Sequence, residues 1–133
     1  MSVGVWNPDG EKGNFEPVSN ELLDRFCACA GGTDEQVDIE SLAQHGLEDQ
    51  AVVMKLDAAA WQGAETLSTE KVIALIRFFT LVEMQVAGWD AGKSSPVIPL
   101  VSILKGRGEF DAGLRKWIKS STSNRYLPYG SAL

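Results

Sequence analysis

The sequence predicts an all-α fold, a compact single-domain bundle of five to six helices around one central apolar helix. Three observations support this expectation. The chain of 133 residues has the usual length of one domain and can bury a core without disulfides or metal. Apolar residues recur at intervals of three and four, and no segment shows sustained apolar–polar alternation. Residues 69–87 are apolar around much of a helical circumference, so they need neighbours on more than one side.

The chain opens with an irregular arm and a first amphipathic helix. Residues 1–18 carry three glycines and two prolines among polar residues, which favours an irregular arm. Ser19 is a good N-cap for a helix, and Gly31 and Gly32 are typical of its end. One stripe of this helix is apolar and consists of Leu22, Leu23, Phe26 and Cys29 or Ala30.

Two further helices are predicted before the central one. The second either begins at a capping box formed by Thr33 and Gln36 or is a shorter helix that Asp38 caps, and it ends at Gly46. The third is predicted from apolar residues at intervals of three and four, and it ends at Gly63. Its apolar positions are Leu47, Ala51, Met54, Ala58 and Trp61.

The central helix has clear boundaries in the sequence. Ser68 or Thr69 caps it, and Glu70 lies in its first turn, where the helix dipole favours a negative charge. Gly88 ends it. Its broad apolar face consists of Val72, Leu75, Ile76, Phe79, Val82 and Val86.

Two more helices and an aromatic tail follow. Ser95 caps the first, Pro96 takes its first helical position, and glycines at positions 106 and 108 end it. Asp111 caps the second, whose inward-facing residues are Leu114, Trp117 and Ile118. The tail, residues 125–133, is rich in aromatic residues and proline, so we expect it to dock on its own domain or on a partner.

The composition is that of a soluble protein. No basic segment followed by an apolar run opens the sequence, and polar residues interrupt its longest apolar stretch, residues 72–86. We therefore expect a cytoplasmic protein without a membrane span. Cys27 and Cys29 point about 200° apart around a helix, and with His45 they fall short of the four ligands of a structural zinc site. Two reduced core cysteines, no metal and no cofactor are expected.

The net charge of −6 is unevenly distributed along the chain. Residues 1–70 hold 14 acidic and 3 basic side chains, whereas residues 71–133 hold 4 acidic and 9 basic ones. Such asymmetry is typical of a surface for an anionic partner, and also of two halves of one domain that complement each other. The second interpretation is favoured.

Residues 88–94, with the sequence GWDAGKS, look like a phosphate-binding P-loop. The match is incomplete, because three residues separate the glycines where the motif requires four. The segment also follows a predicted helix, whereas a P-loop follows a strand. Nucleotide binding is therefore not expected.

Glu83 is the one charged residue in the middle of the apolar face of the central helix. Burial there, near the negative end of the helix dipole, disfavours the charged form of the carboxylate. Catalytic acids and bases have their pKa values shifted in the same way. A structural partner, or a last turn that rotates Glu83 into solvent, is the favoured interpretation. If the chain is instead an enzyme, the catalytic candidates are Glu83 and, in the adjoining loop, Asp90 and Lys93.

Cations and aromatic residues are interleaved between residues 105 and 129. This combination suits single-stranded nucleic acid, but the acidic isoelectric point of about 4.7 opposes such binding. A solvated helix face with a docked tail is the favoured interpretation. The candidate partner-binding residues are Trp89, Arg115, Lys119, Arg125, Tyr126 and Tyr129.

These observations favour a non-enzymatic helical protein-interaction module that binds a protein partner or a second copy of itself. The chain contains no complete catalytic, metal or nucleotide signature. Two alternatives stay open. The basic C-terminal third binds nucleic acid or another acidic partner, or the chain is a small enzyme that uses Glu83 as acid or base.

Overall fold

A computed structural model describes residues 18–30, 39–124 and 126–129 of the chain. Within these residues there are five α-helices, three 3-10 helices and no strand, which confirms the all-α fold. The elements are α1 (Asn20–Ala30), α2 (Ile39–Gln44), η2 (Ala51–Lys55), η3 (Ala58–Thr66), α3 (Thr69–Gln85), η4 (Gly92–Ser94), α4 (Val97–Arg107) and α5 (Ala112–Ser121). The predicted arm before Val18 and the capping box at residues 33–36 lie outside the described residues.

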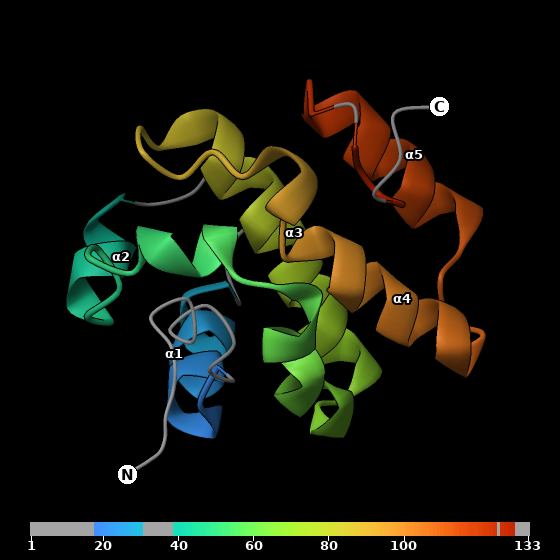
Figure 1. Cartoon of the computed structure of the whole chain (residues 1–133), viewed down its shortest axis with the longest axis horizontal. Helices are drawn as coiled ribbons and strands as arrows, with labels where there is room; N and C mark the ends of the chain where they lie inside the picture. The colour runs from blue at the N-terminus through green and yellow to red at the C-terminus, as the bar shows by residue number, and fades with distance from the viewer. Residues whose placement is uncertain (1–17, 31–38, 125, 130–133) are drawn as a thin grey trace, which may run out of the picture.

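Helix α3 lies in the middle of the bundle, with α1 and α2 to one side and α4 and α5 to the other (Figure 1). The Ser68 hydroxyl begins it by accepting a hydrogen bond from the Lys71 amide at 3.2 Å. Burial extends around the helix, as the sequence predicted, because α1, α4 and α5 all pack against it. Its buried residues are Val72, Leu75, Ile76, Phe78, Phe79, Thr80, Leu81 and Val82.

The end of α3 differs from the expected one by two residues. The helix stops at Gln85 rather than at position 87, because Val86 is extended, with φ −120° and ψ 121°. Gly88 then takes a φ of 89°, which side-chain-bearing residues rarely adopt. The chain therefore turns back on α3 instead of continuing away from it.

Aromatic rings from four segments meet beside α3. Phe26 of α1 lies 5.8 Å from Phe78 and 5.1 Å from Phe79, measured between ring centroids. Trp61 of η3 meets Phe79 edge-on at 5.3 Å, and Trp89 meets both Phe26 and Phe78 at 6.4 Å. All five rings are buried. Edge-to-face contacts of this kind add about 0.5–1.5 kcal/mol per pair beyond burial.

The prediction of a third α-helix is wrong. The chain forms two 3-10 helices there, η2 and η3, separated by an extended stretch at Leu56 and Asp57, whose ψ angles are 157° and 156°. The apolar spacing misled the prediction, because residues three apart share a face in a 3-10 helix as well as in an α-helix. Met54 and Trp61 are still buried, as expected.

The sequence predicted that Gly63 ends the third helix. Gly63 instead lies within η3. A Cβ there would meet the Leu23 Cδ1 atom at 3.4 Å and the Val18 carbonyl oxygen at 3.6 Å. The start of α1 therefore packs against the backbone of η3. The Val18 amide adds to this contact by donating to the Ala60 carbonyl oxygen at 2.8 Å.

The two C-terminal helices form close to where the sequence predicted them. The expected first position, Pro96, is the N-cap of α4, which begins at Val97, and the Ser95 hydroxyl accepts from the Val97 amide at 3.1 Å. Gly108, with φ 71°, ends α4, whereas Gly106 lies inside the helix. The Asp111 carboxylate caps α5 by accepting from the Leu114 amide at 2.7 Å. Leu127 and Pro128 of the tail are buried, so this part of the tail docks on its own domain.

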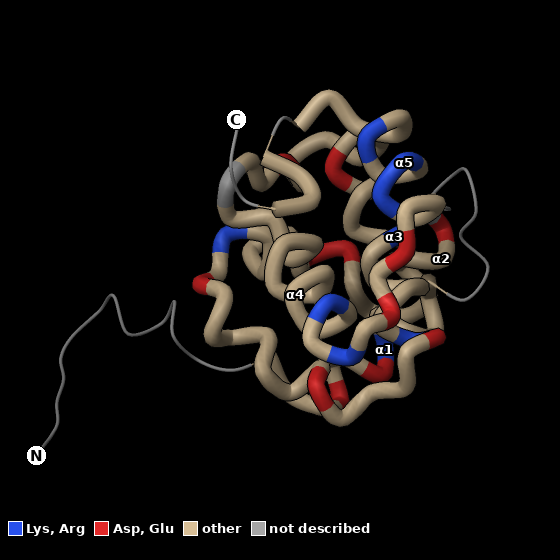
Figure 2. Tube along the Cα trace, turned by 90° about the vertical axis from the view of Figure 1, so that its right-hand side faces the viewer, with Lys and Arg blue, Asp and Glu red and all other residues tan. Residues whose placement is uncertain are grey.

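Acidic and basic residues are distributed over the whole trace, and the charged residues of α5 are all Lys or Arg (Figure 2). Ion pairs between described side chains join Arg25 to Glu21 at 3.0 Å and Lys55 to Asp90 at 3.9 Å. Of these pairs, only the second joins the acidic half of the sequence to the basic half. In the described part of the chain, no helix combines the length and the apolar character needed to cross a membrane.

Replacing Phe79 with alanine is expected to lower the free energy of unfolding by about 3–5 kcal/mol, because the ring is fully buried among Phe26, Trp61 and Phe78. Urea denaturation measures the change. The matched control is Val52→Ala, where the side chain is 61% exposed, with an expected change within about 0.5 kcal/mol. Equal losses in the two variants would contradict this description of the core.

Candidate functional site

The Glu83 carboxylate lies in the last turn of α3 and is half-buried. Its Oε2 atom accepts hydrogen bonds from two successive backbone amides of the following loop, those of Ala91 at 2.8 Å and Gly92 at 3.0 Å. The sequence had identified Glu83 as the residue that the apolar face does not explain. The loop after the helix supplies the compensation.

A third donor comes from the segment after α5. The Asn124 side-chain amide donates to both carboxylate oxygens of Glu83, at 3.1 and 3.2 Å, and to the Gly92 carbonyl oxygen at 2.9 Å. The Asn124 Oδ1 atom accepts from the Tyr126 amide at 2.9 Å. Glu83 and Asn124 therefore hold together the end of α3, the loop before η4 and the start of the tail. We call these residues and the two loop amides the Glu83 node.

This geometry favours the structural interpretation of Glu83 over the acid–base one. Oε2 accepts from three donors, Ala91, Gly92 and Asn124, and Oε1 accepts from Asn124, so the carboxylate is directed at the chain's own donors rather than at a cavity. The structure does not gather the other catalytic candidates around it. Asp90 has a side chain 82% exposed and faces Lys55, while Lys93 belongs to η4 and its side chain lies outside the described part.

The segment that looks like a P-loop binds a carboxylate of the protein itself, that of Glu83. Successive backbone N–H groups form a concave site that favours negative charge. Here the amides of Ala91 and Gly92 are such a pair, and the Glu83 carboxylate fills it. The segment follows α3 rather than a strand, as expected.

The cysteines and the histidine lie near α1 and α2. The Cys29 Sγ atom is 3.5 Å from the Ser41 hydroxyl, and the His45 Nδ1 atom is 2.8 Å from the Ser41 carbonyl oxygen. Cys27 is half-buried, and this burial raises the pKa of its thiol; Lys71 lowers that pKa and Asp24 raises it further. In the described ranges, no three His, Cys, Asp or Glu side chains gather as a metal site.

The predicted partner-binding residues divide into two groups. Trp89 is 2% exposed and packs in the aromatic core, so it is unavailable to a partner. Arg115 and Lys119 are exposed one helical turn apart on α5, with Lys116 beside them. Arg125 lies outside the described residues.

The two tyrosines lie on the tail beside α5. Tyr126 is half-buried, and Tyr129 is 48% exposed. The Tyr129 ring packs edge-on against Phe110 at 6.1 Å, and the Lys105 Nζ atom lies 4.7 Å from its centroid. The contacts fix Tyr129 near the beginning of α5. We call the exposed residues Arg115, Lys116, Lys119 and Tyr129 the α5 face.

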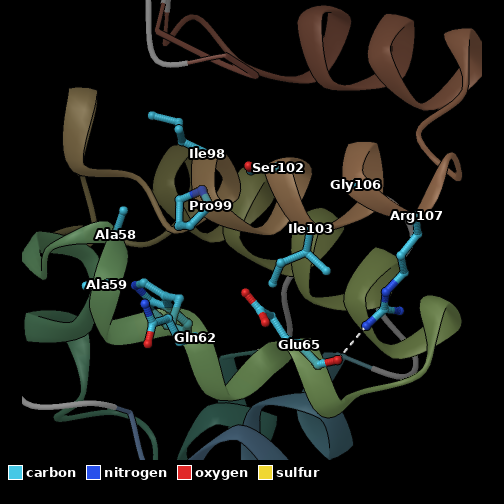
Figure 3. Close-up of a pocket in the computed structure, with 11 residues that line it drawn as sticks. Ala58, Ala59, Gln62, Glu65, Ile98, Pro99, Ser102, Ile103, Gly106 and Arg107 are labelled. Atoms are coloured by element: carbon cyan, nitrogen blue, oxygen red, sulfur yellow. Dashed lines mark hydrogen bonds between the residues drawn. The ribbon is translucent and has the colours of Figure 1, made fainter.

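A groove that the sequence analysis did not predict lies between η3 and α4 (Figure 3). Its volume is about 730 Å³, and it is open to solvent. It is lined by Ala58, Ala59, Trp61, Gln62, Glu65, Ile98, Pro99, Ser102, Ile103, Gly106 and Arg107. Residues 59, 62 and 65 share one side of η3 because they are three apart, a pattern that the expected α-helix concealed.

Glu83→Gln and Asn124→Ala are each expected to lower the free energy of unfolding by about 1–3 kcal/mol. Glu83→Gln replaces one acceptor oxygen by an amide donor among the donors of the Glu83 node, and Asn124→Ala removes one of these donors. Urea denaturation of both single variants and the double variant gives the coupling, expected at about 0.5–3 kcal/mol. The control Asp90→Asn, at an exposed carboxylate, should change stability by under about 0.5 kcal/mol. Strict additivity would contradict the node.

Cys27 is expected to react with iodoacetamide more slowly in the folded chain than in urea, because burial raises the pKa of the thiol and reduces its thiolate fraction. The same shift means that this thiol opposes folding once the pH rises above the unfolded thiol's pKa, about 8.5. A Cys29→Ala background isolates the signal, which mass spectrometry follows. Equal rates in the two states would contradict the description.

Comparison of this chain with protein-family models, with curated proteins and with solved structures finds no significant match to any of them.

Proposed function

We propose that this chain is a non-enzymatic helical interaction module that binds an acidic segment of a partner protein through the α5 face. The observation that carries the proposal is the set of three exposed cations on one short helix, Arg115, Lys116 and Lys119. None of them pairs with a carboxylate among the residues that the structure describes. In a chain of net charge −6, such a surface stands out as complementary to an acidic partner.

The way in which α5 is held supports a preorganised surface. The Asp111 cap fixes its first turn, Leu114 and Ile118 are buried beneath it, and Trp117 lies under the Arg77 guanidinium of α3 at 5.6 Å. The tail fixes the Tyr129 ring beside Phe110. A partner therefore meets cations and a ring on a fixed backbone, which reduces the entropy lost on binding.

A non-enzymatic role agrees with the Glu83 node. The one carboxylate that the sequence identified as an acid–base candidate accepts hydrogen bonds from Ala91, Gly92 and Asn124. These donors support a role for Glu83 in joining the tail to α3.

A second candidate is single-stranded nucleic acid at the same surface. The exposed Tyr129 ring, with the Lys105 Nζ atom 4.7 Å from its centroid, suits a stacked base, and the cations of α5 suit a phosphate backbone. The exposure of Tyr129 favours this alternative, and the acidic half of the chain opposes it.

The test is titration of the full chain with a labelled twelve-residue peptide of glutamate and aspartate, at low and moderate salt. The triple variant R115Q/K116Q/K119Q should bind at least tenfold more weakly than the unmodified chain, because the attraction is electrostatic, and the salt dependence should decrease. The control is K55Q/K71Q, which neutralises two exposed cations on other elements and should leave binding unchanged.

Two results decide between the alternatives. Unchanged peptide binding in the triple variant, or no salt-sensitive binding below about 1 mM, a weak limit for a specific complex, would contradict the proposal. Salt-sensitive binding of a single-stranded DNA twelve-mer below about 100 μM, tighter than that of the peptide, would favour the second candidate instead.

A further inference from the structure

Aliphatic side chains form much of the lining of the groove between η3 and α4 (Figure 3). The charged residues that line it are Glu65 and Arg107. Ile98, Pro99 and Ile103 of α4 form one wall, and Ala58 and Ala59 of η3 form part of the other. Its volume of about 730 Å³ lies within the range of known ligand sites, about 300–1,000 Å³. Because the groove is open to solvent, a segment of polypeptide fits it better than an enclosed small molecule.

Arg107 lines one end of the groove and keeps its positive charge there, because the oxygens that accept its hydrogen bonds are neutral. Its guanidinium donates to the carbonyl oxygens of Glu65 and Leu67, at 2.9 and 2.8 Å, and to the Thr69 hydroxyl at 3.2 Å. These three hydrogen bonds hold the last turn of α4 against the connection between η3 and α3. An incoming anion would have to compete with them.

Glu65 is the groove residue whose charge remains available. Its side chain is exposed, and Figure 3 shows its carboxylate directed toward Ile103, between the two helices, whereas Arg107 reaches the backbone of Glu65. No described residue donates a hydrogen bond to that carboxylate or forms an ion pair with it. The neighbouring polar groups, Gln62 and Ser102, are neutral. Asp57, exposed just before η3, adds a second negative charge at the Ala58 end.

We infer that this groove binds a short segment of a partner protein that carries an arginine or lysine beside aliphatic side chains. The cation pairs with Glu65, and the aliphatic side chains lie against Ile98, Pro99 and Ile103. Charge complementarity sets the choice of partner, because the two carboxylates of Glu65 and Asp57 outnumber the one cation of the groove, Arg107, whose guanidinium is held by three hydrogen bonds to the chain. This site is separate from the α5 face and takes a segment of opposite charge.

The probe is an acetylated, amidated twelve-residue peptide with leucines at helical spacing and arginines between them. Two matched peptides replace every arginine with glutamate or every leucine with serine. Chemical shifts of the isotopically labelled full chain report both the location and the strength of binding. The arginine peptide should shift the amides of Gln62, Ser102 and Ile103, and it should bind at least tenfold more tightly than either matched peptide.

Glu65→Gln should weaken binding of the arginine peptide at least fivefold, because it removes the charge and keeps the shape. Glu48→Gln, which neutralises an exposed carboxylate outside the groove, should leave the affinity unchanged. Ala59→Tyr, at an exposed position of the groove wall, should abolish binding by filling the groove. The R115Q/K116Q/K119Q variant should bind the arginine peptide as the unmodified chain does, which keeps this result independent of the α5 face.

Three outcomes would overturn the inference: equal affinity for the arginine and glutamate peptides, shifts confined to another surface, or an unchanged affinity in Glu65→Gln. A fourth concerns the occupant. If light scattering shows that the chain dimerises by itself and that Ala59→Tyr abolishes the dimer, the groove holds a second copy rather than a partner protein.

Discussion

The burial of α3 is the constraint on which the rest of the structure depends. A helix with apolar residues around most of its circumference cannot lie on the surface of a bundle, so α1, α4 and α5 must pack on different sides of it. Five consecutive residues, from Phe78 to Val82, are all buried, and at about 100° per residue they cover the whole circumference, which one-sided packing would not permit. With α3 enclosed, the surfaces that we propose for binding come from the peripheral elements η3, α4 and α5.

Enclosing the helix creates a difficulty at its C-terminal end, where the chain places a carboxylate. Two loop amides and the Asn124 side chain satisfy Glu83 there, so that a local electrostatic requirement determines how distant segments are joined. The turn at Gly88 is what brings the loop back to α3. The same interaction determines where the tail begins, and hence where Leu127 and Tyr129 lie against the bundle.

Much of the fold could be predicted from local signals, because caps and apolar stripes act within a few residues. Ser68 and Asp111 cap their helices as expected, and the apolar face of residues 69–87 is buried. The segment with residues 51–66 could not be predicted in the same way, since a spacing of three suits two kinds of helix and the extended Asp57 backbone leaves no periodic signal. The groove was missed for that reason. Trp89 was misplaced because a loop position suggested exposure, whereas the turn at Gly88 directs it into the core.

The partner of Glu83 depends on contacts 8 to 41 residues apart, which no periodicity specifies. The sequence showed only that the charge of Glu83 needed a partner.

The two surfaces that we propose for binding rest on a rigid α3, and native-state hydrogen exchange tests that premise most directly. Amides of the middle of α3, from Ile76 to Val82, should exchange slowest and only through global unfolding, while those of α2 and α5 should open at lower free energies. Exchange of α3 amides as fast as those of α5 would contradict the account.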